Sequence, residues 1–445
     1  MRAILSYTVV ACIAAFAILS LTGCAGTSST SGGGNPAISI DSPPAQIGAG
    51  ANWQFSAIVS GASGVNWSVS TPNGGTIDST GLYIAPTTGS FPMSVNVSVS
   101  AQSDPSLSAS ATISVTQTDP LGSAQGTMIS CPTFGGGLPQ DGSTCYQINT
   151  SCDGVADFSA YLKVNEPAGT PLGTVIFGTG TGGAALYDFD EPDFFNGTTN
   201  GGQAVVQTVL DAGFNTVQVT FGSPFTDTTP NGWLTGPGGV RRLACRYATV
   251  AQWVYQNIHN SNTSAPLCAT GNSGGSAAIG YALSDYGLDS IFSMVEVTSG
   301  PPMSRLDQAC LPASNPTCAQ QSFTCNAGDP QEGLSICYTS DDAAIVDTAY
   351  PQPYCQNAIN GSPAPVGFFL SDSVLGAPQR SFPKTRVNQL FGGQDHSAAV
   401  EQGLTWGNTV GSSHACVSDA PHPIPSAADG AAAIATDIVN LCRVQ

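Results

Sequence analysis

Hydrophobic and polar residues alternate with a period of two in several short runs between residues 36 and 117. Such alternation places every second side chain on one face of a sheet, which is typical of strands with one buried face. Turn-forming Gly, Pro, Asn and Ser residues separate the runs. We therefore predict a small all-β sandwich over this region. The runs that carry this prediction lie at 53–59, 65–69, 94–99 and 111–115.

From residue 119 to residue 445 the pattern changes. Continuous apolar runs of about five residues alternate with longer stretches of helical periodicity, which predicts a mostly parallel sheet with flanking helices, an α/β fold. The predicted strands are 174–177, 216–221, 266–270, 293–297 and 387–391, and the predicted helices are 203–212, 240–259, 275–286, 397–407 and 427–441. Residues 187–200 are acidic and aromatic, and we expect a loop there.

A segment at about 301–365 interrupts this alternation. It contains five cysteines and many prolines, and we expect a Cys-rich insertion over the carboxyl edge of the sheet. The chain has 14 cysteines. Cys12 lies in the leader segment and Cys24 at its end, so 12 remain, and this even number predicts up to six disulfides in an exported protein. Cys416 and Cys442 are a plausible pair. Zinc is disfavoured, because no Cys-x-x-Cys pair is present.

The first 23 residues have the features of a leader sequence. Arg2 is followed by an apolar stretch to Leu21, which is short for a membrane-spanning helix. The segment 21–24 resembles the processing box of bacterial lipoproteins. This resemblance implies a signal peptide at 1–23 and lipidation of Cys24. Because Ala25 follows Cys24, it also favours anchoring to the outer membrane, with the protein in the periplasm or at the cell surface. An ordinary secretory signal is the alternative. Residues 24–35, rich in Gly, Ser and Thr, form a flexible linker.

Charge excludes several classes of partner. Ten Lys and Arg oppose 29 Asp and Glu, which gives a formal net charge of −19. We therefore expect no nucleic-acid partner, and long-range repulsion also disfavours polyanionic substrates. The sequence does not indicate the oligomeric state.

Residues 271–275 carry the chemical signal, a Gly-x-Ser-x-Gly motif centred on Ser273. The predicted strand at 266–270 precedes it and a predicted helix follows. A serine at such a sharp turn is exposed, and small residues on both sides allow the strand and the helix to pass closely. The helix N-terminus favours developing negative charge. A Gly-rich turn without chemistry is the alternative interpretation.

This motif and its context resemble the α/β-hydrolase superfamily, over roughly residues 126–444. The region at 36–117 also resembles bacterial Ig-like domains, and its segments 74–78 and 81–86 carry this resemblance. Together these resemblances imply an Ig-like domain, often a spacer or adhesion module, followed by a serine hydrolase catalytic domain at 119–445. The resemblance implies hydrolysis of a small or polymeric carboxylic ester without a cofactor or metal. A serine peptidase of the same fold and a binding protein with a relict site are the alternatives.

The family resemblance also suggests the partners of Ser273. The family has the chain order Ser…Asp…His, with the base in the loop before the final helix, which favours His422. His414 and His396 are the alternatives, whereas we expect His259 to be a surface or capping residue. An apolar strand ending in a Gly turn favours Asp395 as the acid. Competing acids are Asp419, Asp342 and Asp347.

The oxyanion hole needs two backbone amides. Gly274, directly after Ser273, supplies one by position, and the loop at 178–183 resembles the family's glycine loop and suggests Thr181 for the other. Gly180 and Gly182 remain alternatives. The same glycines spell Gly-x-Gly-x-x-Gly, a dinucleotide-binding pattern. We reject that interpretation because no helix is expected directly after it, and because the next strand ends without an acidic residue.

Overall fold

The computed structural model describes residues 37–131, 142–190, 201–222, 231–326, 329–363 and 366–444. The predictions for the signal peptide at 1–23, the linker at 24–35 and lipidation of Cys24 therefore lie outside the described residues. Within the described ranges, no helix is both long enough and apolar enough to cross a membrane.

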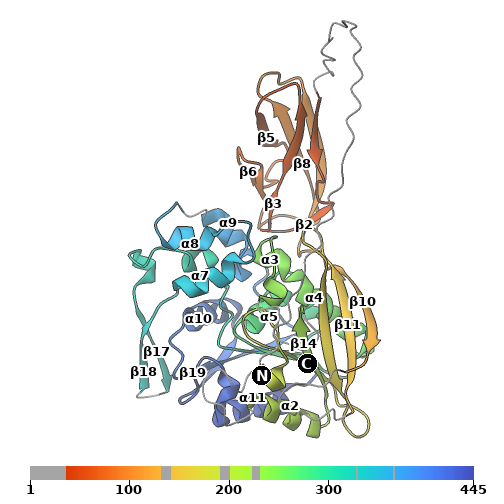
Figure 1. Ribbon diagram of the computed structural model, residues 1–445, viewed down its shortest axis with the longest axis vertical. Helices are drawn as coiled ribbons and strands as arrows, with labels where there is room; N and C mark the ends of the chain where they lie inside the picture. Colours follow the sequence, from red (N-terminus) through yellow and green to blue (C-terminus); the bar gives the residue numbers. More distant parts are fainter. Residues whose placement is uncertain are drawn as a thin grey trace, which may run out of the picture.

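The N-terminal region contains strands only, as the alternation predicts, and forms the lobe at the top of Figure 1. A four-stranded sheet has the order β2-β9-β8-β5, a three-stranded sheet has the order β3-β7-β6, and β1 pairs with β4. The strands are β1 Ala37–Asp41, β2 Gln46–Gly48, β3 Asn52–Gln54, β4 Ser56–Ser60, β5 Val65–Val69, β6 Thr76–Ile77, β7 Leu82–Ile84, β8 Met93–Ala101 and β9 Ser108–Thr116.

One predicted strand of this region is divided in two. The alternating run at 53–59 is interrupted at Phe55, whose amide donates to the carbonyl of Gly81. Strand β3 pairs with β7, whereas β4 pairs with β1 in a different sheet, so the chain changes sheets at this residue. The Phe55 ring is buried in the core between the strands, next to Tyr83 and Trp67.

The larger region is built on a nine-stranded sheet with the order β10-β11-β12-β14-β13-β15-β16-β19-β20. The six strands from β14 to β20 run parallel to one another, as predicted. This arrangement is consistent with the α/β-hydrolase fold. Its strands are β10 Ser123–Ile129, β11 Thr144–Ser151, β12 Phe158–Asn165, β13 Thr174–Gly178, β14 Asn215–Phe221, β15 Leu267–Asn272, β16 Met294–Thr298, β19 Arg386–Gly392 and β20 Ser413–Val417.

Strands β10, β11 and β12 pair antiparallel along one edge of the sheet, and the sequence did not predict them. Their burial pattern explains the omission. Strand β10 alternates between exposed and half-buried residues and lacks a continuous apolar run. The central strand β13 is buried at every position, which is the pattern that makes a parallel strand recognisable.

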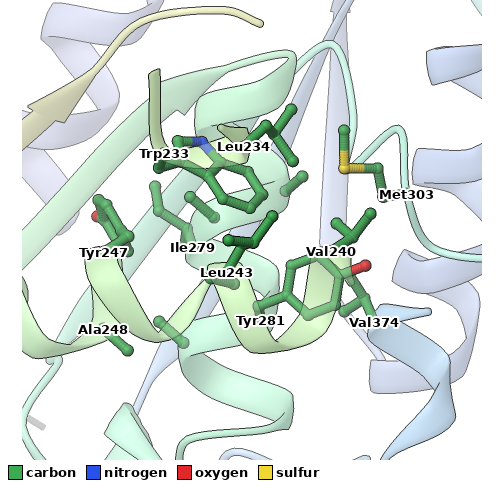
Figure 2. Packing of buried hydrophobic residues seen from close by; sticks show 14 of the residues in the cluster. Trp233, Leu234, Val240, Leu243, Tyr247, Ala248, Ile279, Tyr281, Met303 and Val374 are labelled. Carbon is green, nitrogen blue, oxygen red and sulfur yellow. The ribbon is translucent and has the colours of Figure 1, made fainter. Parts of the chain in front are cut away.

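Helices cover both faces of the sheet. On one face α2 (Gly201–Asp211) packs beside α11 (Ala428–Leu441), and their apolar sides share a core with β13 and β15. On the other face α4 (Cys245–Asn257) packs against α5 (Gly274–Ser284). Figure 2 shows side chains of this second layer in contact, with Trp233 beside Leu243 and Ile279. The helix predicted at 240–259 is interrupted at Ala244, which separates α3 (Val240–Leu243) from α4.

The Cys-rich insertion folds into a β-hairpin and short helices at one side of the sheet (Figure 1). The hairpin is β17 (Gln321–Asn326) with β18 (Asp329–Leu334). Its helices are α6 Leu306–Ala309, α7 Ser340–Asp347 and α8 Tyr354–Ile359, followed by α9 Val366–Ser371, and α10 (Ala398–Val410) lies between β19 and β20. The loop predicted at 187–200 instead begins with a single helical turn, α1 (Tyr187–Asp190), and residues 191–200 lie outside the described ranges.

The 12 cysteines from Cys131 to Cys442 all form disulfides, as predicted from their even number. The bonds are Cys131–Cys145, Cys152–Cys245, Cys268–Cys442, Cys310–Cys355, Cys318–Cys337 and Cys325–Cys416.

The predicted pairing of Cys416 with Cys442 is wrong. Helix α11 packs beside α2 and its end reaches the central strand β15, so Cys442 pairs with Cys268. Strand β17 of the insertion lies next to β20, so Cys416 pairs with Cys325.

Candidate active site

The sheet order creates a switch point beside β13. The chain passes from β13 to β14 on one side and then returns across β13 to β15 on the other. In open α/β sheets, ligands bind outside the carboxyl ends of the strands where the order reverses in this way. The loop after β13 and the turn after β15 meet at this point, and they contain Thr181 and Ser273.

Ser273 is the single residue between β15 and α5. Its backbone has φ 50° and ψ −113°, a left-handed conformation that non-glycine residues rarely adopt. The amide of Ser273 donates to the carbonyl of Thr298 at 2.8 Å, and the amide of Ala277 donates to the carbonyl of Ser273 at 3.0 Å. Ser273 is half-buried between fully buried neighbours. Ser273 therefore remains partly accessible at the turn, whereas the residues on either side of it are buried.

The glycines of the motif permit contacts that any side chain would block. A Cβ on Gly271 would lie 2.6 Å from the backbone carbon of Gly275, which explains why the strand and the helix cross with a glycine at both positions. A Cβ on Gly274 would lie 1.7 Å from the carbonyl oxygen of Thr181. The elbow is thus packed against the loop after β13 without intervening side chains.

Gly274 and Thr181 lie on either side of the Ser273 turn. Gly274 opens α5, where the amides of the first turn have no acceptor within the helix. Thr181 has φ 48°, and its loop is closed by a bond from the amide of Gly183 to the carbonyl of Gly180 at 2.9 Å. A Cβ on Gly180 would lie 3.7 Å from the Cβ of Ser273. The loop therefore contacts the elbow itself, whereas a Cβ on Gly182 would lie 1.8 Å from the carbonyl oxygen of Asn231, so that glycine serves a different contact.

Asp395 and His422 form a direct pair. The ring Nδ1 of His422 lies 2.8 Å from Oδ2 of Asp395. Asp395 follows β19 and is only 1% exposed, whereas the side chain of His422 is 32% exposed. The two turns are joined by backbone bonds, because the amide of Gln394 donates to the carbonyl of Ala420 at 2.9 Å. A helix and a strand separate the two residues in sequence, as predicted.

The surroundings of Asp395 keep it ionised. Its burial alone would raise the pKa of the carboxyl group. Hydrogen bonds from the His422 ring and from Ser397, together with the charge of the protonated ring, hold this pKa below its ordinary value. The amide of Ser397 donates to Oδ1 at 2.9 Å, so both carboxylate oxygens are engaged.

Ser299 connects the His422 loop to the elbow, and the sequence analysis missed it. Its hydroxyl donates to the carbonyl of His422 at 2.6 Å, and it directly follows Thr298, which accepts the amide of Ser273. Ser299 is fully buried with φ 50°. Ser397 was also missed; its hydroxyl lies 3.1 Å from Nδ1 of His422. A serine two residues after the predicted acid, at the start of a predicted helix, was the available signal.

The other histidines have different surroundings. His259 is buried rather than at the surface, with Nδ1 3.1 Å from Oγ1 of Thr174 and Nε2 2.9 Å from the carbonyl of Asn262. His414 lies on β20, exposed, with its ring near Phe323 and Phe391. His396 is exposed beside Asp395.

The competing acids occupy other positions. Asp342 belongs to the capping box of α7 with Thr339, and Asp347 accepts the amides of Cys355 and Gln356. Asp419 is exposed. Within the described ranges, no three His, Cys, Asp or Glu side chains gather closely enough to hold a metal ion.

No protein-family model matches the sequence, and no curated protein matches it. Solved structures overlap about two thirds of the chain weakly. A bacterial heroin esterase aligns with a TM-score of 0.42 and 15% identity over 69% of this chain and 87% of its own. A lipase in an open form aligns with a TM-score of 0.39 and 15% identity over 67% of this chain and 98% of its own. An esterase domain from a Rhodothermus marinus protein aligns with a TM-score of 0.36 and 11% identity over 66% of this chain and 96% of its own. Overlaps of this size do not assign an activity to the chain.

Proposed function

We propose that this protein is a serine hydrolase that cleaves carboxylic esters through an acyl-enzyme. The observation that carries the proposal is the 2.8 Å bond between Nδ1 of His422 and the buried Asp395, at the sheet edge where Ser273 occupies a strained turn. A serine hydroxyl is a weak nucleophile without a base. A histidine that is oriented by a carboxylate supplies that base.

In the proposed reaction, Ser273 Oγ attacks the ester carbonyl carbon while Nε2 of His422 takes the hydroxyl proton. The amides of Gly274 and Thr181 donate to the oxyanion of the tetrahedral intermediate. Its collapse breaks the bond to the alcohol, which leaves with the proton from His422. Water then attacks the acyl-enzyme with His422 again as base, which releases the acid and restores Ser273. Each oxyanion donor typically contributes about 10²- to 10³-fold to kcat.

Asp395 holds the imidazole in one tautomer and orientation. Because Nδ1 donates to the carboxylate, Nε2 is the nitrogen that acts as base. The lowered pKa of Asp395 keeps the carboxylate charged at neutral pH, so it stabilises the imidazolium that forms during attack.

The proposal is tested by labelling with a fluorophosphonate probe and by hydrolysis of p-nitrophenyl butyrate. The wild-type protein should react with the probe and turn over the ester, and Ser273→Ala should do neither, with a loss of about 10⁶-fold in kcat. Ser284→Ala, at the other end of the same helix, is the matched control and should keep both properties. Labelling that persists in Ser273→Ala contradicts the proposal. Faster cleavage of an aminoacyl p-nitroanilide than of the ester indicates a peptidase.

We also propose that the protein is exported and anchored to the outer membrane through lipid on Cys24. The leader pattern at 1–24 supports this, and so do six disulfides, which persist in oxidising compartments. In cells grown with labelled palmitate, the wild-type protein should carry label and Cys24→Ser should not. An unlabelled wild-type protein in the soluble periplasmic fraction contradicts the anchor but leaves the proposed chemistry unaffected.

A further inference from the structure

A cavity of about 520 Å³ lies between the all-β region and the larger region. Strand β3, helix α3 and helices α8 and α9 come together around it (Figure 1). Its volume falls in the range of small-molecule sites, about 300–1,000 Å³. None of the residues that line it belongs to the Ser273, Asp395 and His422 constellation, so the proposed reaction leaves this cavity unexplained.

One wall of the cavity is aromatic. Tyr350, Tyr354 and Phe368 line it, and their ring centroids lie 5.3–5.9 Å apart. Tyr350 is buried and its hydroxyl donates to Asp372, whereas Tyr354 and Phe368 are half-buried. The rings support one another, so they offer a rigid apolar surface that loses little conformational entropy when a ligand binds.

The opposite wall, from the all-β region, is rich in hydrogen-bond acceptors. The amide nitrogen of Gln54 donates to the carbonyls of Phe55 and Thr80, and the amide nitrogen of Asn52 donates to Oγ of Ser371. Asp78 uses Oδ1 to accept from Thr80 and Leu82.

The donor ends of both amides are therefore used within the protein. In the part of the chain that the structure describes, no group donates to Oε1 of the exposed Gln54 or to Oδ1 of Asn52. The exposed carboxylate of Asp78 accepts from Thr80, Leu82 and Gly81 and still has lone pairs for a further donor. A ligand that fits this wall must bring hydrogen-bond donors of its own.

The charge of the site disfavours an anion. Arg242 is the one cationic residue of the lining, and its guanidinium is already engaged, 4.5 Å from the centre of the Trp53 ring and donating to the carbonyl of Asn52. The carboxylate of Asp78 and the net charge of −19 repel negative ligands. An alkyl chain fits no better, because it would cover three acceptors without satisfying them.

Buried contacts hold the two walls in place. The side chain of Arg241, 3% exposed, forms ion pairs with Asp119 at 2.6 Å and Asp285 at 2.8 Å. The same arginine donates to the carbonyl of Ala49, and the amide of Gly48 donates to Asp119. The all-β region is thus fixed to the larger region, and the cavity exists before any ligand binds.

We propose that this cavity binds a neutral oligosaccharide, separately from the proposed ester-cleaving site. A sugar ring has apolar C–H faces that stack on aromatic rings, and its edge carries hydroxyl donors. Both features match the two walls, and a neutral chain experiences no charge repulsion. The cavity would hold a glycan while the catalytic region acts on an ester.

The test is isothermal titration of the full chain carrying Ser273→Ala, so that binding is measured without turnover and independently of the proposed chemistry. The probes are the β-1,4-linked hexaoses of glucose, xylose and mannose, with decanoate and trigalacturonate as the apolar and anionic comparisons. We expect at least one hexaose to bind with Kd below about 1 mM, and the two comparisons not to bind.

Two variants locate the binding. Tyr354→Ala removes an aromatic platform, and Asp78→Asn exchanges one acceptor for a donor while it keeps the Oδ1 that organises the turn. Each should weaken hexaose binding at least about tenfold. Gln147→Ala, on β11, is the matched control, since its amide also donates to neighbouring polar groups but is not part of the cavity lining. If Tyr354→Ala lowers the melting temperature, its loss of binding could reflect unfolding, and the binding measured with Asp78→Asn is then the test.

Three outcomes overturn the proposal. The first is that no hexaose binds below about 1 mM. The second is that a hexaose binds equally well to both variants. The third is that decanoate or trigalacturonate binds and the variants lose that binding instead.

Discussion

The hydroxyl of Ser299 donates to the backbone carbonyl of His422 at 2.6 Å. Ser299 follows β16 directly, and the preceding carbonyl, that of Thr298, accepts the amide of Ser273. The end of one strand therefore holds both the elbow and the loop of the proposed base. Neither contact involves a reacting atom, so Ser299 is a positioning residue.

We expect Ser299→Ala to lower kcat for p-nitrophenyl butyrate by about 10- to 100-fold, with a smaller effect on KM. The His422 carbonyl loses its buried donor, which costs about 1–3 kcal/mol and allows the loop to shift. Ser299 has φ 50°, so Ser299→Gly is the informative comparison: it loses the same hydroxyl but relaxes the backbone. Equal kcat losses in both variants point to the hydrogen bond. If Ser299→Gly retains activity and Ser299→Ala does not, backbone strain rather than the hydrogen bond accounts for the loss, and the positioning role is contradicted.

The pH dependence should show one protonation on its acid side. A protonated imidazole cannot act as base, so kcat/KM should fall toward acid pH as His422 becomes protonated. The pKa of Asp395 is held below its ordinary value, so this carboxylate stays charged down to at least that ordinary value of about 3.9. Its contribution to stability is complete above the unfolded pKa of about 3.9 and is lost only as the pH falls further.

A kcat/KM profile measured from pH 4.5 to 8.5 checks this prediction. The logarithm of kcat/KM should fall with a limiting slope of one. A slope of two above pH 5 would mean that a second group, such as Asp395, becomes protonated there, against the low pKa assigned to it.

The Cys268–Cys442 bond should contribute more to stability than the Cys318–Cys337 bond. The first joins the central strand β15 to the end of α11 and closes 174 residues, whereas the second closes 19 within the insertion. Chain entropy alone gives about 5 and about 3 kcal/mol. The pair of variants Cys268→Ala with Cys442→Ala should therefore lower the urea midpoint more than Cys318→Ala with Cys337→Ala. The reverse order would show that the insertion, not the link from the last helix to the sheet, limits unfolding.

The sequence predicted the elbow because its requirements are local. A strand, a turn and a helix must meet at Ser273 within a few residues, and Gly271 is needed for the close contact with Gly275. Gly274, by contrast, allows the approach of Thr181 from the distant loop after β13. The proposed acid and base were found differently. Asp395 follows an apolar strand that ends in a Gly turn, whereas His422 was chosen because the resemblance places the base in the loop before the final helix.

Features that depend on distant packing could not be predicted. Nothing near Ser299 in sequence indicates that its partner lies 123 residues away. The pairing of Cys442 depended on which strand the end of α11 reaches, and the expected link between the last strand and the last helix was wrong. The antiparallel strand β10 was missed because it alternates between exposed and half-buried residues, and β12 was missed because polar Lys163 and Asn165 interrupt its apolar pattern although they are buried.

The last prediction separates His422 from His414. His422 is paired with Asp395 and its loop is bonded to Ser299, whereas His414 is an exposed residue of β20 with its ring near Phe323 and Phe391. We expect His422→Ala to lose about 10⁴-fold or more in kcat, because the proton of Ser273 then has no acceptor. His414→Ala should retain kcat and change stability by about 1 kcal/mol at most, through lost ring contacts. Measurements of kcat and melting temperature on both variants distinguish the roles. If His414→Ala is folded but inactive while His422→Ala is active, the base is His414 on β20. Within the described residues, the structure gives His414 no carboxylate partner.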